Sequence, residues 1–305
     1  MVEVKEIKSI ELVPFTLMTS SIGAILALIY AIILLITFGI LAAVIPTAGL
    51  IFASLGISMI VLYPIGTFLV YITLSFVTAL IYNMLVPRLG GIKLGLEGDE
   101  VRSVPVVSFA LIMAGVAAVW AFIIGLLLAA LIVPVTTLVS TIIPLVSSIA
   151  ANATNLTPAT LPTGSVVGTG GVVIAVLLII ALPILVFVFG FIGHALAAIF
   201  YNFIIPRVGG VKLLFAPAGT NHEITSIPVV AASLALASVA VIFGIIYGII
   251  GLINGLAAGN ASMGVGSLIG NIIGSFIGTF IMVALITIFY NFLAPRIGGV
   301  QLGLK

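Results

Sequence analysis

The chain has 305 residues, of which 63% are hydrophobic and only 5% are charged, and its mean hydropathy is +1.54. Soluble domains carry about 25% charged residues, so this composition excludes a water-soluble globule, and its hydrophobicity excludes disorder. The net charge is +2 and the basic residues form no run, so a nucleic-acid partner is not indicated. The chain has no cysteine, which excludes disulfide and thiolate chemistry. The sequence predicts an all-α integral membrane protein with several spans.

All charged residues lie in four windows, at 3–11, 88–102, 207–223 and 296–305. Each of the three charge-free stretches between them is long enough for two helical spans of about 20 residues. Because all nine Lys and Arg residues lie in the windows, the positive-inside rule places every window and both termini on the cytoplasmic face of the plasma membrane. Six transmembrane helices are predicted, at 15–45, 57–86, 104–133, 171–205, 227–254 and 264–294.

The segment between the third and fourth predicted helices is apolar but contains Pro134, Pro144 and several Ser and Thr residues. If it crossed the membrane, the number of crossings would become odd and the next basic window would lie outside. We therefore expect 134–150 to form an interfacial or re-entrant helix, and 152–170 to form the largest outer loop. Three glycosylation acceptor patterns agree with this topology, at Asn152, Asn155 and Asn260.

One sequence motif recurs three times, each time at the end of a predicted helix. It contains a Tyr-Asn pair, a Pro-Arg pair, a Gly-Gly pair and an alternating tail. The three copies consist of Tyr82, Asn83, Pro87, Arg88, Gly90 and Gly91; of Tyr201, Asn202, Pro206, Arg207, Gly209 and Gly210; and of Tyr290, Asn291, Pro295, Arg296, Gly298 and Gly299. Related segments also begin each copy, at 6–10, 100–104 and 223–227. The chain thus divides into three parallel two-helix repeats, at 1–96, 97–215 and 216–305.

The motif has the features of a helix end. Proline lacks the N–H that would serve the carbonyl of the Asn four residues earlier, so we expect the Asn amide to serve local carbonyls. Proline also disfavours helical backbone at the preceding residue, and the Gly-Gly pair supplies the positive φ that turns the chain. We expect the Tyr ring in the aromatic belt and the Arg as a membrane anchor at headgroup depth. The alternative is that the three arginines bind headgroups or another ligand.

The Tyr-Asn pair, the Gly-Gly pair and the alternating tail together resemble a small membrane domain of unknown function. That family occurs in actinobacterial and archaeal proteins and usually holds two helices in a single copy. It opens with a short segment containing Ile and Ser and then an Asp-Pro pair, in whose place this chain has Glu11, Pro105 or Pro228. The resemblance implies a membrane domain and no activity.

The predicted spans contain no Asp, Glu, Lys or Arg, which are the usual markers of proton relays and ion paths. We interpret His194 as a hydrogen-bonded packing residue, with metal or haem ligation and substrate contact as alternatives. Two glycine ridges indicate helix packing, or else a subunit interface or pore wall. They consist of Gly244, Gly248, Gly251, Gly255 and Gly259, and of Gly266, Gly270, Gly274 and Gly278. Asn271 lies beside the second ridge and is expected to hydrogen-bond across it.

The repeat junctions contain alternating segments separated by turn residues, which predicts short cytoplasmic strands. We expect 91–96 to pair with 100–104 and 210–215 with 223–227. The two chain ends, 2–10 and 299–304, are then left to pair with each other, which would hide two open edges and give six strands.

These patterns predict a non-enzymatic protein without catalytic, cofactor or metal sites. We expect a structural or accessory subunit whose partners are membrane lipid and other membrane subunits, or a second copy of the chain. The alternative is a channel or facilitator that carries neutral small solutes or lipids along the axis of the repeats.

Overall fold

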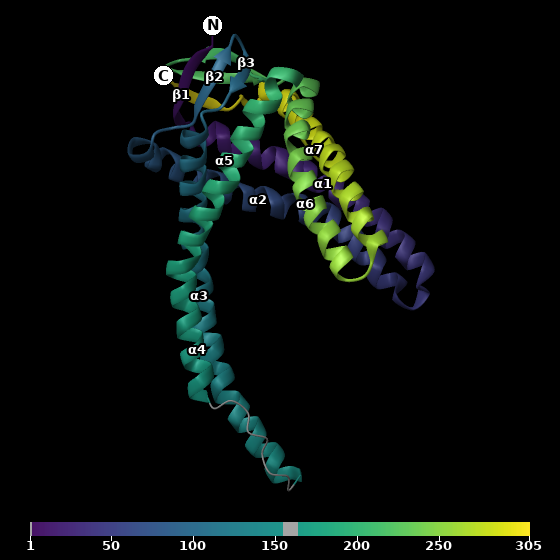
Figure 1. Ribbon diagram of the computed structural model, residues 1–305. Helices are drawn as coiled ribbons and strands as arrows, with labels where there is room; N and C mark the ends of the chain where they lie inside the picture. Colours follow the sequence, from purple (N-terminus) through teal and green to yellow (C-terminus); the bar gives the residue numbers. More distant parts are fainter. Residues whose placement is uncertain (1, 155–163) are drawn as a thin grey trace. The chain divides into compact units, whose positions relative to one another are not determined.

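The computed structural model describes residues 2–154 and 164–305, in which short strands alternate with long helices (Figure 1). The helices are α1 (Leu12–Val44), α2 (Gly49–Leu89), α3 (Val106–Thr154), α4 (Gly164–Val176), α5 (Leu182–Val208), α6 (Val229–Ala257) and α7 (Ala261–Ile297). A 3₁₀ turn at Pro46–Ala48 joins α1 to α2, and a π-helical turn at Leu177–Ala181 joins α4 to α5. The strands are β1 (Glu3–Ile10), β2 (Lys93–Glu97), β3 (Glu100–Ser103), β4 (Val211–Lys212), β5 (Leu214–Ala218), β6 (Asn221–Ser226) and β7 (Gln301–Leu304).

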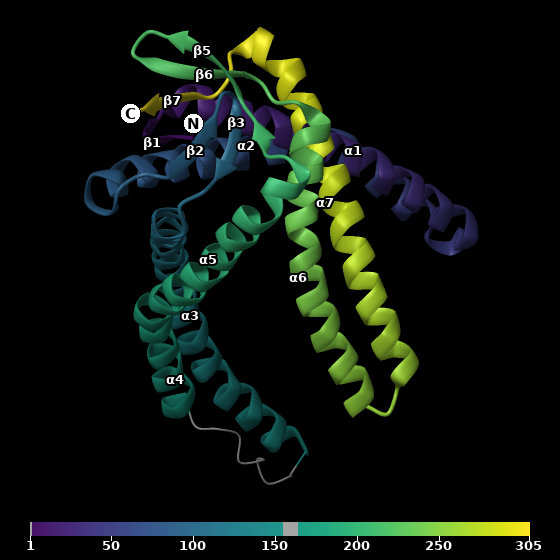
Figure 2. The same ribbon diagram turned by 45° about the horizontal axis from the view of Figure 1, so that its top comes forward.

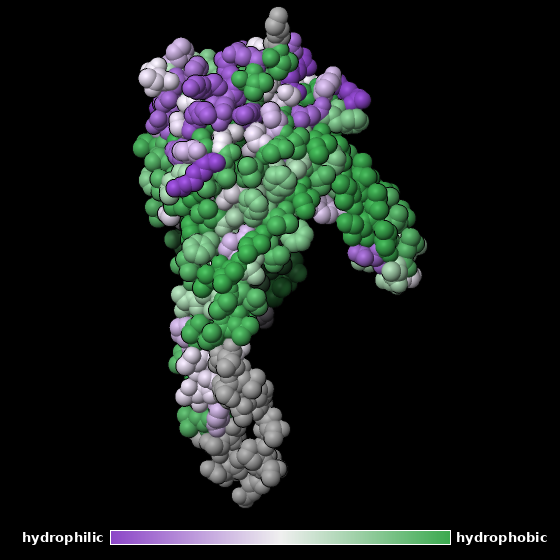
Figure 3. Space-filling model, turned by 60° about the vertical axis from the view of Figure 1, so that its left-hand side comes forward, coloured by the Kyte–Doolittle hydropathy of each residue, from purple (hydrophilic) through white to green (hydrophobic). Residues whose placement is uncertain are grey.

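Within the described residues, six helical segments are long and apolar enough to cross a membrane, which confirms the expected number. They are Leu12–Val44, Gly49–Leu89, Val106–Val146, Gly170–Val208, Val229–Ala257 and Ala261–Ile297. Even α6, at 29 residues, is about 44 Å long and exceeds a hydrocarbon core of about 30 Å. Hydrophilic residues gather over the strands, while the helices present a hydrophobic surface (Figure 3). Apolar surface of this kind is stable in lipid rather than in water.

The extent of α3 corrects two expectations. α3 continues through Pro134 and Pro144 to Thr154, so 134–150 is not a separate interfacial or re-entrant helix. The expected loop at 152–170 is also too long, because α3 ends at Thr154 and α4 begins at Gly164. A proline removes only one helix hydrogen bond. Hydroxyls of the same helix donate to carbonyls one turn back, as Thr137 does to Val133 over 2.8 Å, and such bonds support helices in membranes.

The described part of the chain forms two compact units. One unit comprises the chain up to Ile112 together with Ala195–Lys305, and it holds all seven strands of the described chain. In this unit α1 packs along α2, α6 packs along α7, and α1 also contacts α7. The other unit, Met113–His194, contains most of α3, the helix α4 and the first part of α5.

The strands form one sheet in the order β4-β3-β2-β1-β7-β6-β5 (Figure 2). The same chain segment provides both ends of this order, because only Leu213 separates β4 from β5. β4 pairs with β3, β5 pairs with β6, and the Leu213 N–H donates to the Asp99 carbonyl over 2.7 Å. The sheet therefore curls round and closes on itself. It has seven strands rather than the expected six because Leu213 interrupts the second tail.

The two chain ends pair with each other, as expected. β1 and β7 are antiparallel neighbours, and Ser9 lies opposite Gly303. Glu6 and Lys305 exchange two backbone hydrogen bonds, of 2.7 and 3.0 Å. β1 uses its first half, Glu3–Glu6, to pair with β2 on its other side. The chain ends thus complete the ring of strands.

The strand register is the same at corresponding positions of the sequence. A head strand pairs with a tail strand at Glu6 and Lys93, at Glu100 and Lys212, and at Glu223 and Gln301. Neighbouring copies pair at Gly95 and Ser103, at Leu214 and Ser226, and at Gly303 and Ser9, with a bulge beside each pair. The side chains of Ile7, Val101 and Ile224 are buried at equivalent places. The likeness between the three copies thus extends from sequence to backbone pairing.

Candidate functional site: a clasp repeated three times

Polar side chains at the ends of three helices form hydrogen bonds to the strand that begins each copy, which we call the head strand. We name this set of contacts the clasp. Each clasp has four members, namely the Tyr and Asn of the motif, its second Gly, and a Glu of the head strand. Clasp 1 consists of Tyr82, Asn83, Gly91 and Glu6; clasp 2 of Tyr201, Asn202, Gly210 and Glu100; and clasp 3 of Tyr290, Asn291, Gly299 and Glu223.

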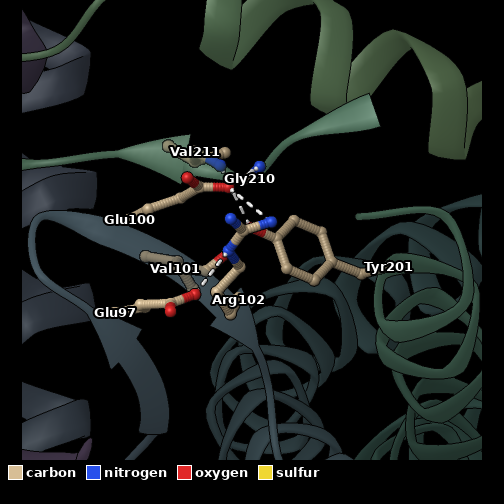
Figure 4. A network of polar contacts seen from close by, with 7 residues as sticks. All are labelled: Glu97, Glu100, Val101, Arg102, Tyr201, Gly210 and Val211. Carbon is tan, nitrogen blue, oxygen red and sulfur yellow. Dashed lines mark hydrogen bonds and ion pairs between the residues drawn. The ribbon is translucent and has the colours of Figure 1, made fainter. Parts of the chain in front are cut away.

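The clasp tyrosines are buried, with exposed fractions of 3%, 8% and 5% in chain order, so their expected place in an aromatic belt is wrong. Each hydroxyl donates to a carbonyl of the head strand and accepts from a backbone N–H of the tail, and Figure 4 shows the residues of clasp 2. The donated bonds run from Tyr82 to Ile7, from Tyr201 to Val101 and from Tyr290 to Ile224, over 2.7, 2.6 and 2.5 Å. One buried hydroxyl thus joins the two strands of its copy.

The amides of the clasp asparagines do not hydrogen-bond to the local carbonyls, so the expectation based on the missing proline N–H is wrong. Each amide bonds both the N–H and the C=O of a single residue at the end of the head strand. These residues are Ile10, Val104 and Ile227, and all six bonds are 2.7–2.8 Å long. The helices also run through their prolines and end two residues later, at Leu89, Val208 and Ile297. The proline therefore lies in the last helical turn, where a lost N–H removes only one bond.

The two glycines of each pair have different roles. The first has a positive φ, of 81° at Gly90, 92° at Gly209 and 83° at Gly298. With ψ of 157° at Gly90, this conformation is essentially restricted to glycine. The second glycine has no positive φ but lies against the strand carbonyl that the Tyr hydroxyl binds. A Cβ at Gly91, Gly210 or Gly299 would lie less than 3.0 Å from that oxygen.

Sequence reasoning missed the fourth member of the clasp, the glutamate. Its Oε1 accepts from the N–H of the second glycine, over 2.7 Å for Glu6 and 2.5 Å for both Glu100 and Glu223. The available signal was that a Glu begins the related segment of all three copies. The partners are 85, 110 and 76 residues apart, and no local pattern links a carboxylate to so distant an N–H.

Cations accompany the glutamate in two of the clasps. The Lys8 ammonium lies 2.8 Å from Glu6, and the Arg102 guanidinium lies 3.3 Å from Glu100 and 3.1 Å from Glu97 (Figure 4). The corresponding residue of the third copy is Thr225. Lys8 and the N–H of Gly91 hold the pKa of the Glu6 carboxyl below its ordinary value of 4.5, because both stabilise the carboxylate. Partial burial opposes this shift but does not reverse it.

The three arginines of the motif are exposed in the last turns of their helices. The Arg207 guanidinium lies 4.3 Å from the centre of the Phe203 ring and donates to the Phe203 carbonyl over 2.6 Å. Arg296 makes the same two contacts with Phe292. The residue four positions before Arg88 is Met84, so the first copy has no aromatic ring at this position. A cation at a helix C-terminus is favourable, and the exposed guanidinium groups remain available to phosphate. Their role as headgroup anchors stays a prediction.

The isolated polar residues make local contacts. The His194 Nδ1 lies 2.7 Å from the Gly190 carbonyl, in keeping with a packing role. Asn271 donates to the Ser267 carbonyl of its own helix over 2.7 Å, so the bond expected across the ridge is wrong. Asn260 caps α7 by accepting from the Met263 N–H over 3.0 Å. The other two expected glycosylation positions, Asn152 and Asn155, lie outside the residues whose side chains are described.

The two glycine ridges differ. The first packs α6 on α7, where a Cβ at Gly255 would lie 2.5 Å from the backbone of Gly264 and one at Gly251 would overlap Ser267. Gly259 is not part of this packing, because it lies beyond the end of α6 in the turn to α7, with a positive φ of 70°. The second ridge, on α7, faces away from these contacts. A Cβ at Gly266, Gly270, Gly274 or Gly278 would have no described atom within 4 Å.

An apolar cavity of about 240 Å³ lies against clasp 2. Its walls come from β3, α3, α5, β4 and α6, and they include Val101, Tyr201 and Val239. The clasp directs its polar atoms toward the backbone of the chain itself rather than into this cavity. Chemically, the arrangement is suited to fasten helices to strands.

Comparison with protein-family models, with curated proteins and with solved structures finds no match for this chain.

Proposed function

We propose that the protein is a multi-pass membrane scaffold, acting as a structural or accessory subunit of a membrane assembly. In this proposal, three parallel two-helix repeats are fastened to one closed sheet by three equivalent clasps. The clasp geometry is the observation that carries the proposal. The polar groups of the repeated motif bind backbone atoms of the same chain, so the motif maintains shape rather than handling a substrate.

The burial of the strands supports a scaffold over a channel. Ile7, Val101 and Ile224 are equivalent residues of the three copies, and each is at least nine-tenths buried. Leu96 and Leu302 are buried in the same sheet. Apolar side chains at these places oppose a hydrated path through the sheet, which a channel along the repeat axis requires.

The orientation is part of the proposal. All nine basic residues lie on the strands, beside them or in the last turns of helices that lead to them. By the positive-inside rule, this side and both termini are cytoplasmic, and the arginines of the motif meet headgroup phosphates. Because the chain lacks cysteine, Asp99→Cys and Ala258→Cys can be labelled singly with an impermeant maleimide. The two positions should react from opposite sides, and labelling from one side would refute the topology.

Two measurements test the proposed function. Purified protein in lipid vesicles should pass glycerol and urea no faster than protein-free vesicles, with a pore-forming peptide as the positive control. Native mass spectrometry after extraction in mild detergent should detect more than the 31.3 kDa single chain. Rapid flux would favour the channel alternative, whereas a solitary chain would refute the role as a subunit.

We also propose that each repeat is a copy of the small two-helix domain that it resembles. The Tyr-Asn pair and the Gly-Gly pair, on which the resemblance rests, are clasp residues. A structure of a single-copy member should then show its Tyr hydroxyl and Asn amide bonded to its own head strand. Bonds to lipid or to another protein in their place would refute this proposal.

A further inference from the structure

A second cavity lies between α1, α2 and α7, away from the clasps. Its volume is about 320 Å³, which falls within the range of about 300–1,000 Å³ that small-molecule sites occupy. The apolar part of its wall comes from Leu26, Ala27, Met282 and Ile286. The polar part comes from the Thr67 hydroxyl and three tyrosines, Tyr30, Tyr63 and Tyr71.

The three tyrosine hydroxyls are the unusual feature of this cavity. Among the described residues, none of the three hydroxyls has a hydrogen-bond partner, in contrast to the fully bonded clasp tyrosines, and the three side chains are 42–48% exposed on the helix surface. A hydroxyl without a partner is costly in an apolar medium, and Tyr in such surroundings usually finds one. Three unsatisfied donors around one cavity therefore point to an occupant that supplies acceptors.

The depth of the cavity below the membrane surface indicates that an occupant would come from the bilayer. Gly23, which lies in the wall against the Tyr71 ring, is 11 residues from the start of α1 at Leu12. That distance is about 17 Å along a helix, near the middle of a hydrocarbon core of about 30 Å. Tyr71 thus lies deeper than an interfacial aromatic belt, whereas Tyr30, 18 residues from Leu12, lies about 27 Å along α1, near the far end of such a core. A molecule that reaches this depth enters from the bilayer.

The lining also restricts the chemistry of the occupant. Among the described residues no charged side chain lines the cavity, so a neutral head is favoured over an ionic one. A shallow groove on the exposed surface of α2 continues from this cavity and shares Tyr63, Thr67 and Tyr71 with it. Its remaining wall, which includes Leu62, Gly66 and Val70, suits an aliphatic chain.

We propose that the tyrosine-lined cavity binds a neutral membrane amphiphile that presents carbonyl oxygens on an aliphatic chain. The carbonyl oxygens accept hydrogen bonds from Tyr30, Tyr63 and Tyr71, and the chain lies along α2. Two bilayer molecules share this chemistry, a quinone with an alkyl tail and a diacylglycerol. This inference does not depend on whether the protein is a scaffold.

Isothermal titration calorimetry in detergent micelles tests the proposal with two separate probes, decylubiquinone and dioctanoylglycerol. At least one probe should bind saturably, with one molecule per chain, and the probe that binds identifies the source. The triple variant Tyr30→Phe, Tyr63→Phe, Tyr71→Phe keeps all three rings and removes only the hydroxyls. It should bind at least about tenfold more weakly, because hydrogen bonds of ordinary strength are lost in a low dielectric.

Tyr247→Phe is the matched control, since Tyr247 is also an exposed tyrosine but lies on α6, outside the cavity. It should bind the probe as the unchanged protein does. Thermal unfolding without probe establishes that each variant is folded, and the three single Tyr→Phe variants replace the triple variant if that one unfolds. Failure of both probes to bind, or equal binding by the folded hydroxyl-free variant, would overturn the proposal.

Discussion

Replacing the second glycine of a clasp with alanine tests the clasp geometry most severely. In Gly91→Ala the new methyl group would lie less than 3.0 Å from the Ile7 carbonyl oxygen and 3.2 Å from the Tyr82 hydroxyl. Neither neighbour can yield easily, because the first is strand backbone and the second is a buried ring. The strand must therefore move away, and the bonds that cross this contact must lengthen or break.

The expected cost follows from two contributions. Forcing extra volume into a well-packed site costs about 1–3 kcal/mol. The movement also weakens the bond from Tyr82 to Ile7 and the bond from Gly91 to Glu6, and a buried group left without its partner costs about 1–3 kcal/mol. We therefore expect Gly91→Ala to lower the free energy of unfolding by about 2–6 kcal/mol.

Titration with sodium dodecyl sulfate, followed by circular dichroism, measures this loss in detergent-solubilised protein. Gly274→Ala is the matched control, because its methyl group would have no described atom within 4 Å. It should be neutral or stabilising by up to about 1 kcal/mol, since alanine favours a helix over glycine. Equal stability of Gly91→Ala and the unchanged protein would show that the clasp is looser than described.

Three further predictions follow from the charge, the helix packing and the chain ends. The pKa of the Glu6 carboxyl is lower in the folded than in the unfolded protein, so its contribution to stability is complete above a pH of about 4.5 and is lost as the pH falls further. Glu6→Gln should therefore reduce the loss of stability in acid, as measured by unfolding titrations at several pH values. Gly251→Leu should separate α6 from α7 and lower the unfolding midpoint, whereas Gly274→Leu should not. Deleting residues 2–10 should increase amide hydrogen exchange in β7 as well as in β2, because β1 pairs with both, and unchanged exchange in β7 would contradict the pairing of the ends.

The sequence was most informative where a strong physical constraint acts over a whole segment. Charges cannot remain unpaired in hydrocarbon, so their confinement to four windows predicted six candidate spans. Alternation in 2–10 and 299–304, and the need to hide open strand edges, predicted the pairing of β1 with β7. Gly98, between β2 and β3, has the positive φ of 60° that a tight turn requires.

The sequence was least informative about side chains that can form hydrogen bonds with either local or distant partners. Asn83 was assigned to local carbonyls because Pro87 lacks a donor, yet its amide bonds Ile10, which lies 73 residues away. Tyrosine is typical of membrane interfaces, but the Tyr82 hydroxyl donates to Ile7 of β1, which is distant in sequence and lies nearby only in the folded chain. Pro134 was assigned as a helix break, although one missing bond does not end α3.

The chain ends complete a ring of strands whose register is the same at the three copies of the motif. An engineered disulfide tests this claim directly, since the chain has no cysteine of its own. A Cβ at Gly303 would lie 3.6 Å from that of Ser9, and one at Gly95 would lie 3.5 Å from that of Ser103. Both distances fit a disulfide, for which about 3.5–4.5 Å is usual.

Three double-cysteine variants are therefore oxidised in the membrane and examined by mass spectrometry of their peptides. The pair at 95 and 103 lies in one hairpin and serves as the positive control, and the pair at 103 and 303 lies on strands that are not neighbours. We expect the pair at 9 and 303 to form a disulfide within one chain as readily as the positive control, and the pair at 103 and 303 to stay reduced. A pair at 9 and 303 that stays reduced while the positive control is oxidised would contradict the closed ring.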